Sequence, residues 1–299
     1  MMKKTTSALA IAALLGTGAA TAATFQIDDN TTFSVSGDVE FSYRDIEGKS
    51  ATIADRGSEV QFSGEHTSDN GLTTFFNLEI SGFDSMGSAD TDILSDGDAS
   101  LGVSADFGTI SIGDLETAYA SLADITDVTT DVGLSADDTG NRPQSLQYQS
   151  PEFNGVQLTV DTQVAASDDT DVKGLEETSA RVDINLGGVT VMVGHDTENT
   201  TTGVGATTTV SGVDLGAKFS TASDSDTDVF GVTAGTSVGP VNVYGAFERI
   251  DAAADARNAI AGGVSYPVAD NLTVHAEMSQ LDKANDDGDT VAVGATLKF

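Results

Sequence analysis

The sequence predicts an all-β fold, a transmembrane antiparallel up-and-down β-barrel of sixteen strands. Three observations lead to this prediction. The chain begins with an export signal, its segments alternate apolar and polar residues, and the connections between those segments are short and long in turn. Strands that cross a membrane must close into a barrel, because lipid offers no hydrogen-bond partner to an open sheet edge.

The first 22 residues have the three parts of a secretory signal peptide. Lys3 and Lys4 precede an apolar run over 8–15, and Ala20 and Ala22 frame a small-x-small cleavage site. The apolar run is too short to span about 30 Å of hydrocarbon, so it predicts a cleaved peptide and not an anchor. We therefore expect signal peptide 1–22 to be removed, and residues 23–299 to form a single barrel domain.

Alternating side chains predict the strands. In residues 32–43, apolar side chains such as Phe33 and Val35 alternate with polar ones such as Ser34 and Asp38. Successive side chains of a strand point to opposite faces, so this segment has one apolar and one polar side. The same pattern predicts sixteen strands, at about 31–43, 57–66, 72–83, 98–106, 108–114, 144–150, 155–166, 178–186, 189–196, 204–211, 213–221, 228–238, 241–250, 257–266, 271–281 and 289–299.

Every second connection between these strands is short. Seven are tight and carry turn residues, such as Asn70-Gly71, whereas the eight between them are mostly longer and rich in Asp, Thr, Ser and Gly. Sixteen antiparallel strands with both chain ends on one side give this count. A secreted soluble sandwich also alternates apolar and polar residues, but it does not need its connections to segregate in this way. A β-solenoid of calcium-binding repeats would need a glycine-rich nonapeptide, which the chain lacks.

Composition excludes several functions. The chain has 13 Lys+Arg against 47 Asp+Glu, a formal charge of -34, and no Cys. Such a chain repels nucleic acid and forms neither disulfides nor thiolate metal sites. His66, His195 and His275 are far apart with no metal-ligand spacing, and no catalytic signature is readable, so we expect no enzyme activity, no cofactor and no metal site. Ca²⁺ at loop carboxylates is the one alternative, because clusters such as Asp224-x-Asp226 offer oxygen ligands.

The longest connection, 115–143, is the candidate constriction. A sixteen-stranded barrel encloses an aqueous channel too wide to discriminate solutes unless something narrows it. Apolar residues such as Tyr119, Leu122 and Ile125 recur at three-residue spacing, which predicts a short helical turn packed against the wall. The alternative is an external loop without a fixed position. Its acids include Glu116, Asp124, Asp127 and Asp131.

Two internal segments and the chain end resemble the proteobacterial general-diffusion porins, the Gram-negative outer-membrane porin family. Residues 107–113 resemble the turn and strand that enter the porin constriction loop, and 145–155 resemble the strand and turn that follow it. The terminal Phe299 matches the C-terminal signature of outer-membrane barrels. The resemblance implies a homotrimeric, water-filled channel in the outer membrane of a Gram-negative bacterium, with the third external loop folded into the lumen. It also implies passive diffusion of ions and small hydrophilic solutes.

The chain departs from the family at the loop entrance. Related porins have Gly-Arg where this chain has Gly113-Asp114, so an acid replaces a wall arginine. The candidates left for the basic side of the pore are Arg44, Arg56, Arg142 and Arg181. A narrow passage lined mainly by one sign of charge concentrates counter-ions, so with Asp114 added to the loop acids we predict cation selectivity.

The acid-rich external connections suggest two further readings. They fit a saline habitat, or divalent-cation bridges to lipopolysaccharide beside the outer-membrane lipid. They also leave open an alternative function, in which the barrel serves as an adhesin or surface receptor through those loops.

Overall fold

The computed structural model describes residues 22–81, 97–134, 137, 139–164, 175–198, 200–252, 255–281 and 288–299. The predicted signal peptide, apart from Ala22, lies outside the described residues. Within the described part, no helix is long and apolar enough to cross a membrane. The strands are β1 (Ala23–Asp28), β2 (Thr31–Ile46), β3 (Thr52–Asp55), β4 (Glu59–Thr67), β5 (Thr73–Ile80), β6 (Ala99–Ala105), β7 (Gly108–Glu116), β8 (Asn141–Gln149), β9 (Val156–Val164), β10 (Leu175–Asn185), β11 (Val189–Asp196), β12 (Thr201–Val210), β13 (Val213–Ala222), β14 (Thr227–Val238), β15 (Val241–Ala252), β16 (Asp255–Ala269), β17 (Leu272–Leu281) and β18 (Thr290–Lys298).

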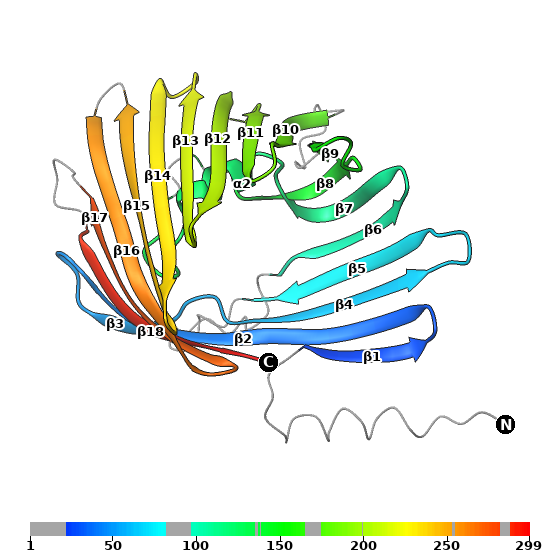
Figure 1. The fold of residues 1–299 in the computed structure, drawn as a ribbon, viewed down its shortest axis with the longest axis horizontal. Helices are drawn as coiled ribbons and strands as arrows, with labels where there is room; N and C mark the ends of the chain where they lie inside the picture. The colour runs from blue at the N-terminus through cyan, green and yellow to red at the C-terminus, as the bar shows by residue number, and fades with distance from the viewer. Residues whose placement is uncertain are drawn as a thin grey trace, which may run out of the picture.

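Sixteen of these strands, β2 and β4 to β18, form a closed antiparallel barrel. Each pairs with its neighbours in chain order, and β18 pairs back onto β2, from Thr290 beside Ile46 to Lys298 beside Asp38. Figure 1 shows consecutive strands side by side around the ring. Each of the sixteen predicted segments overlaps one of these strands, so the predicted fold class is confirmed.

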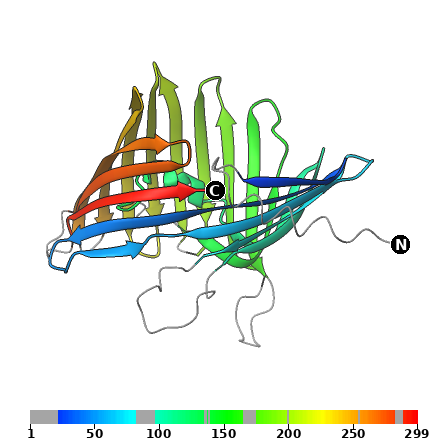
Figure 2. The ribbon, with the colours of Figure 1, turned by 90° about the horizontal axis from the view of Figure 1, so that it is seen from below.

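Two short strands were not predicted. β1 pairs with the first residues of β2, with Ala23 beside Val35. The main-chain groups of Phe299 and Gly37 exchange two hydrogen bonds of 2.9 Å, so β1 continues the line of β18 along the same edge of β2. Figure 2 shows the carboxyl end of the chain beside the start of β1. The other short strand, β3, lies in the predicted connection 44–56 and pairs with the end of β2.

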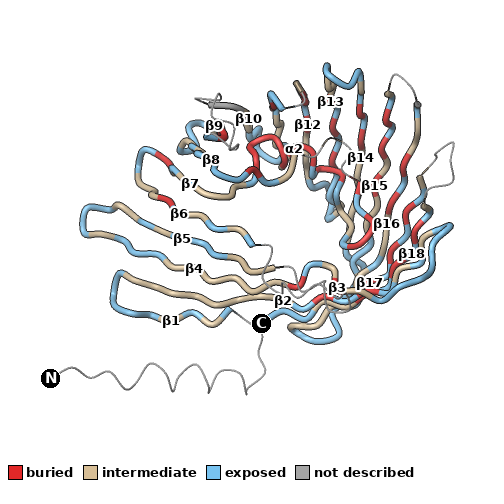
Figure 3. The backbone as a smooth tube through the Cα atoms, turned by 180° about the vertical axis from the view of Figure 1, so that it is seen from behind, coloured by how far each residue is buried: buried red, intermediate tan, exposed pale blue. Residues whose placement is uncertain are grey.

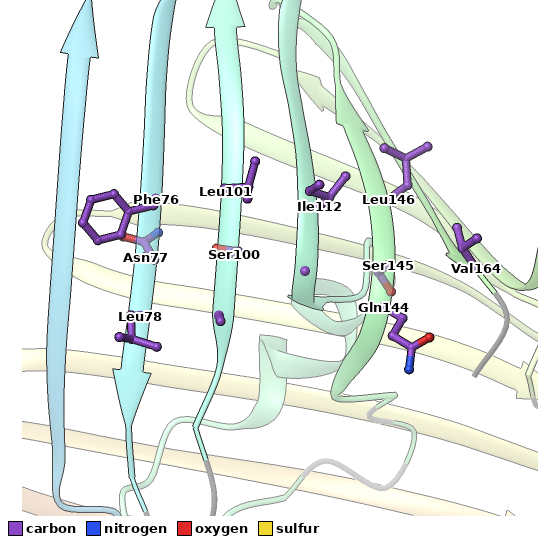
Figure 4. Close-up of a pocket in the computed structure, with 12 residues that line it drawn as sticks. Phe76, Asn77, Leu78, Ser100, Leu101, Ile112, Gln144, Ser145, Leu146 and Val164 are labelled. Atoms are coloured by element: carbon purple, nitrogen blue, oxygen red, sulfur yellow. The ribbon is translucent and has the colours of Figure 1, made fainter. Parts of the chain in front are cut away.

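The outer face of the barrel is apolar. Phe76 lies beside Leu101, Leu101 beside Ile112, and Ile112 beside Leu146, which makes one row across β5 to β8. All four are exposed, and they border a shallow hollow of about 650 Å³ that Figure 4 shows at close range. An apolar band that faces outward is what a barrel presents to lipid.

Buried residues gather on the other, polar side of the sheet. Figure 3 shows them in the segment around the short helix α2 (Ala120–Ala123) and along strands β12 to β18, whereas β4 and β5 are intermediate or exposed. Segment 117–134 therefore packs against the polar side of the strands and forms the core together with strand residues such as Ala246, Ala259 and Ala292.

Candidate functional site

A short helix in the longest connection packs on glycines of the wall. α2 continues into the 3-10 turn η2 (Asp124–Thr126), as the apolar spacing predicts. Tyr119 and Leu122 are fully buried. A Cβ added at Gly203 would lie 2.7 Å from Tyr119 Oη and 2.8 Å from Leu122 Cδ2, so the close approach requires glycine there. The loop therefore has a fitted position on β11 to β15.

Lys218 of β13 anchors the helix end. Its Nζ lies 2.5 Å from Asp137 Oδ1 and 3.0 Å from Glu248 Oε1, and it donates a hydrogen bond of 2.7 Å to the Ala123 carbonyl. The Lys218 and Glu248 side chains are 0% and 1% exposed. Thr126 Oγ1 donates to Glu248 at 2.5 Å. One buried cation thus joins two parts of the loop to the wall.

Tyr119 makes a further contact with the loop. Its hydroxyl donates to Asp137 Oδ2 at 3.1 Å. Burial, together with the nearby Asp137 carboxylate, raises the pKa of the Tyr119 phenol. The phenol therefore stays protonated and keeps its role as a donor.

Arg142 of β8 holds the start of the loop. Its guanidinium lies 3.0 Å from Asp161, 3.2 Å from Glu177, 2.8 Å from Asp196 and 3.3 Å from Glu198. Asp161 in turn accepts a hydrogen bond of 2.5 Å from the Ala118 main chain. A guanidinium has five N–H donors and can therefore pair with four carboxylates better than an ammonium group could.

A third anchor holds the loop tip. Asp131 accepts hydrogen bonds from Ser42 Oγ at 2.8 Å and from His275 Nε2 at 2.7 Å, and it lies 3.8 Å from Arg56 Nε. The Glu277 carboxylate accepts the main-chain N–H groups of Asp131 and of the residue before it. Burial alone would raise the pKa of Asp131, but the bonds from His275 and Ser42 outweigh burial and lower that pKa below its usual value.

The predicted acidic residues occupy three kinds of place. Asp124 and Asp127 are exposed on the loop, and Glu116 is exposed at the end of β7. Asp114 lies at a β-bulge in β7, next to the Asp98 carboxylate. Asp131 differs from the other four, because it is buried in the anchor at the loop tip.

The predicted cations lie at two separate places on the barrel wall. Arg44 and Arg56 are electrostatic neighbours beside Asp131. Arg142 is buried among carboxylates, and Arg181 binds Asp183 at 2.9 Å and donates to the Ala118 carbonyl at 2.7 Å. These two hold the loop start, so the four arginines do not form one cluster.

The sequence placed some of the anchoring residues on predicted strands but did not link them to the loop. These are Lys218, Glu248, His275 and Glu277, which contact the loop from positions 81 to 147 residues away. Their alternation marked a polar face, and nothing in their local spacing linked them to the loop.

A row of carboxylates crosses strands that α2 and η2 do not touch. Asp38 lies directly opposite Glu59, the Glu59 carboxylate neighbours Glu79 and Asp98, and Asp98 neighbours Asp114. All five are partly exposed. We call them the acidic row. Like charges set opposite each other destabilise a sheet, so this arrangement costs stability unless cations are near. The described cation beside the row is Lys298, opposite Asp38.

This architecture defines a class. A closed antiparallel barrel with an apolar outside, a polar inside and a loop fitted to its polar wall is an outer-membrane β-barrel. The family model for Gram-negative porins matches residues 5–298. The chain therefore belongs to the Gram-negative porin family, which confirms the resemblance and the outer-membrane location.

Relatives and solved structures agree with this family. The chain is 26% identical to a monosaccharide porin of Halomonas sp. and to the major outer membrane protein of Halomonas elongata, with full coverage of all three chains. The structure matches that of the anion-selective porin from Comamonas acidovorans with a TM-score of 0.72 at 15% identity. The match covers 90% of this chain and all of the Comamonas chain. OmpT of Vibrio cholerae, in its trimer form, matches with a TM-score of 0.70 at 15% identity, over 91% of this chain and all of that one. The chain is thus an outer-membrane channel for solute diffusion.

Proposed function

We propose that the channel is cation-selective and passes ions and small hydrophilic solutes passively, with segment 115–143 as its constriction. The observation that carries this proposal is the acidic row on the wall. Four of its carboxylates lie on β2, β4, β5 and β7, Asp98 lies directly before β6, and Lys298 lies at one end of the row. Charged side chains that line a pore set its ionic preference.

Four of the described cations are paired elsewhere and do not balance that row. Arg142 is surrounded by four carboxylates and Lys218 by two. Arg181 is paired with Asp183, and Arg56 lies against Asp131. These positive charges are used to hold the loop, so an entering anion meets mainly carboxylates. A permeating cation meets a field that attracts it.

The loop narrows the passage unevenly. Its anchors contact β2, β9, β10, β13, β15 and β17, strands that lie around the ring, so the segment reaches across the polar interior. Its helical part packs on β11 to β15. The free passage then runs between the exposed loop acids Glu116, Asp124 and Asp127 and the acidic row.

The relatives suggest a solute and an oligomeric state for this channel. A Halomonas relative is named a monosaccharide porin, and it aligns over the whole chain. We propose uncharged sugars of that size among the solutes. A trimer form of the Vibrio cholerae neighbour supports a homotrimer, with the outer-membrane lipid and lipopolysaccharide around it. The Comamonas neighbour is anion-selective, but at 15% identity it shares the fold and not the wall charges.

Reversal potentials across a planar bilayer test the selectivity. Under a KCl gradient we expect K⁺ to permeate better than Cl⁻, and the double variant Glu59→Gln/Glu79→Gln to lower the permeability ratio. The matched control is Asp224→Asn/Asp226→Asn, which removes two exposed charges from the connection between β13 and β14. The gradient is set at low salt, since the Debye length is about 10 Å at 0.1 M. An anion preference in the wild-type channel, or equal effects of the two double variants, would refute the proposal.

A further inference from the structure

We propose that the anchor at the loop tip is a metal site, in which Glu40, Asp131 and His275 bind one divalent transition-metal ion such as Zn²⁺. One potential ligand atom from each residue lies within 4.8 Å of the other two. All three residues are buried, with 8%, 8% and 4% exposure. They come from β2, from the loop and from β17, so an ion there would tie the constriction to the wall.

The Glu40 carboxylate gives independent evidence for a bound ion. Its Oε1 is buried and has no hydrogen-bond partner among the described residues. A buried carboxylate oxygen without a partner is costly, because it has lost its water and gained nothing in exchange. A metal ion shared with Asp131 and His275 would remove that cost.

The other two ligands are already oriented. Asp131 Oδ1 is held by Ser42 Oγ at 2.8 Å, which leaves Oδ2 to face His275 Nε2 at 2.7 Å. The Glu277 carboxylate fixes the loop main chain at Asp131 and is itself bound by the Tyr244 hydroxyl at 2.7 Å. Partners of this kind, which orient ligands from behind, are typical of metal sites.

The wall is shaped for the imidazole. Gly294 of β18 lies between His275 and Ser42 in the sheet register. A Cβ at Gly294 would collide with the His275 ring and lie 3.0 Å from Ser42 Cβ. The ring therefore lies over the glycine and reaches Asp131, which a larger residue would prevent.

The ligand set indicates the class of metal. One imidazole nitrogen with two carboxylate oxygens suits Zn²⁺ or a similar ion, whereas Ca²⁺ and Mg²⁺ favour sites made of oxygen alone. Ligand atoms at about 2.0–2.2 Å from a tetrahedral ion lie about 3.3–3.6 Å apart. The ends of the Glu40 and Asp131 side chains would need to move by about 1 Å or somewhat more. A solvent molecule would complete the fourth position.

Metal titration of the folded, full-length barrel in detergent tests the site. The protein is first stripped with a chelator and then titrated with Zn²⁺ against a chromophoric competitor. Millimolar Ca²⁺ is kept present to occupy oxygen-only clusters. We expect one Zn²⁺ per chain, with a loss of affinity of at least tenfold in His275→Gln and in Glu40→Gln. His195→Gln is the matched control, because His195 is exposed on β11, and its affinity should stay within twofold of wild type.

A second measurement, the visible spectrum of bound Co²⁺, uses the wild-type chain and needs no variant. Co²⁺ bound to the wild-type chain should give the visible bands of a four- or five-coordinate ion, and Zn²⁺ should displace them. A wild-type chain that binds less than one Zn²⁺ in the presence of Ca²⁺ would overturn the proposal, as would unchanged affinity in a folded His275→Gln variant. Neither result bears on ion selectivity, so this proposal and that of cation preference can fail separately.

Discussion

Removal of the Lys218 charge should release the loop from the wall. In Lys218→Met a side chain of similar length stays, but the ammonium that bridges Asp137 and Glu248 is lost. Two carboxylates with 4% and 1% exposed side chains are then left facing each other in a buried site. Breaking a buried ion pair by removing one partner costs about 3–5 kcal/mol. At about 1.4 kcal/mol per factor of ten, the lower figure raises the detached population about 100-fold.

Thiol labelling measures that population directly. The chain contains no Cys, so Ala120→Cys introduces one reporter at a helix position that is 2% exposed. A buried thiol reacts only when the loop leaves the wall, and its labelling rate then follows the open fraction. We expect Lys218→Met to raise that rate about 100-fold, with larger fluctuations of single-channel current.

The control variant loses the same charge at a lysine that does not anchor the loop. Lys298→Met also deletes one ammonium from the barrel, but Lys298 is exposed at the end of β18. Its labelling rate should match that of the unsubstituted reporter. Equal rates in the Lys218 and Lys298 variants would show that the buried cation does not hold the loop, and the argument from the anchors would fail.

Two further predictions concern packing and pH. Gly203→Val should displace the helix, because new side-chain atoms would occupy the space of Tyr119 and Leu122. Single-channel conductance should therefore change. The control Gly239→Ala, in an exposed turn, should leave the conductance unaltered. Cation preference should fall as pH is lowered, since protonation of the wall carboxylates removes their charge. A permeability ratio that stays constant from pH 7 to about 3 would contradict the acidic row as its source.

The strands were predictable because their signal is local. In residues 32–43 each side chain alternates with the next, and burial on one face of a sheet demands that period of two. The structure extends this strand to Ile46 and adds β1 and β3 at its flanks. These two were missed because they are only four to six residues long. In β1 the residues Ala23, Phe25 and Ile27 do alternate with polar ones, but so short a pattern does not show which strand it pairs with.

The loop anchors were not predictable for the opposite reason. Asp131 meets Ser42 and His275 across 89 and 144 residues of sequence, and no spacing rule connects such positions. The expectation of no metal site rested on the wide separation of the histidines. Only barrel closure brings β17, β18 and β2 together, so that His275 of β17 reaches the loop beside Ser42.

The two sets of charges explain how an acidic chain can keep a fixed loop and an acidic passage at once. Every carboxylate in the interior of the barrel repels its neighbours, so the loop acids Asp131 and Asp137 need cationic or hydrogen-bonding partners where they are buried. Lys218 meets that need at Asp137 and Arg56 at Asp131, and Arg142 pairs with Asp161, the wall carboxylate that binds the loop main chain at Ala118. With so few bases in the chain, this use leaves mainly carboxylates along the passage. If the channel prefers cations as proposed, that preference and the stability of the loop are therefore linked. A base moved from an anchor to the passage should weaken both.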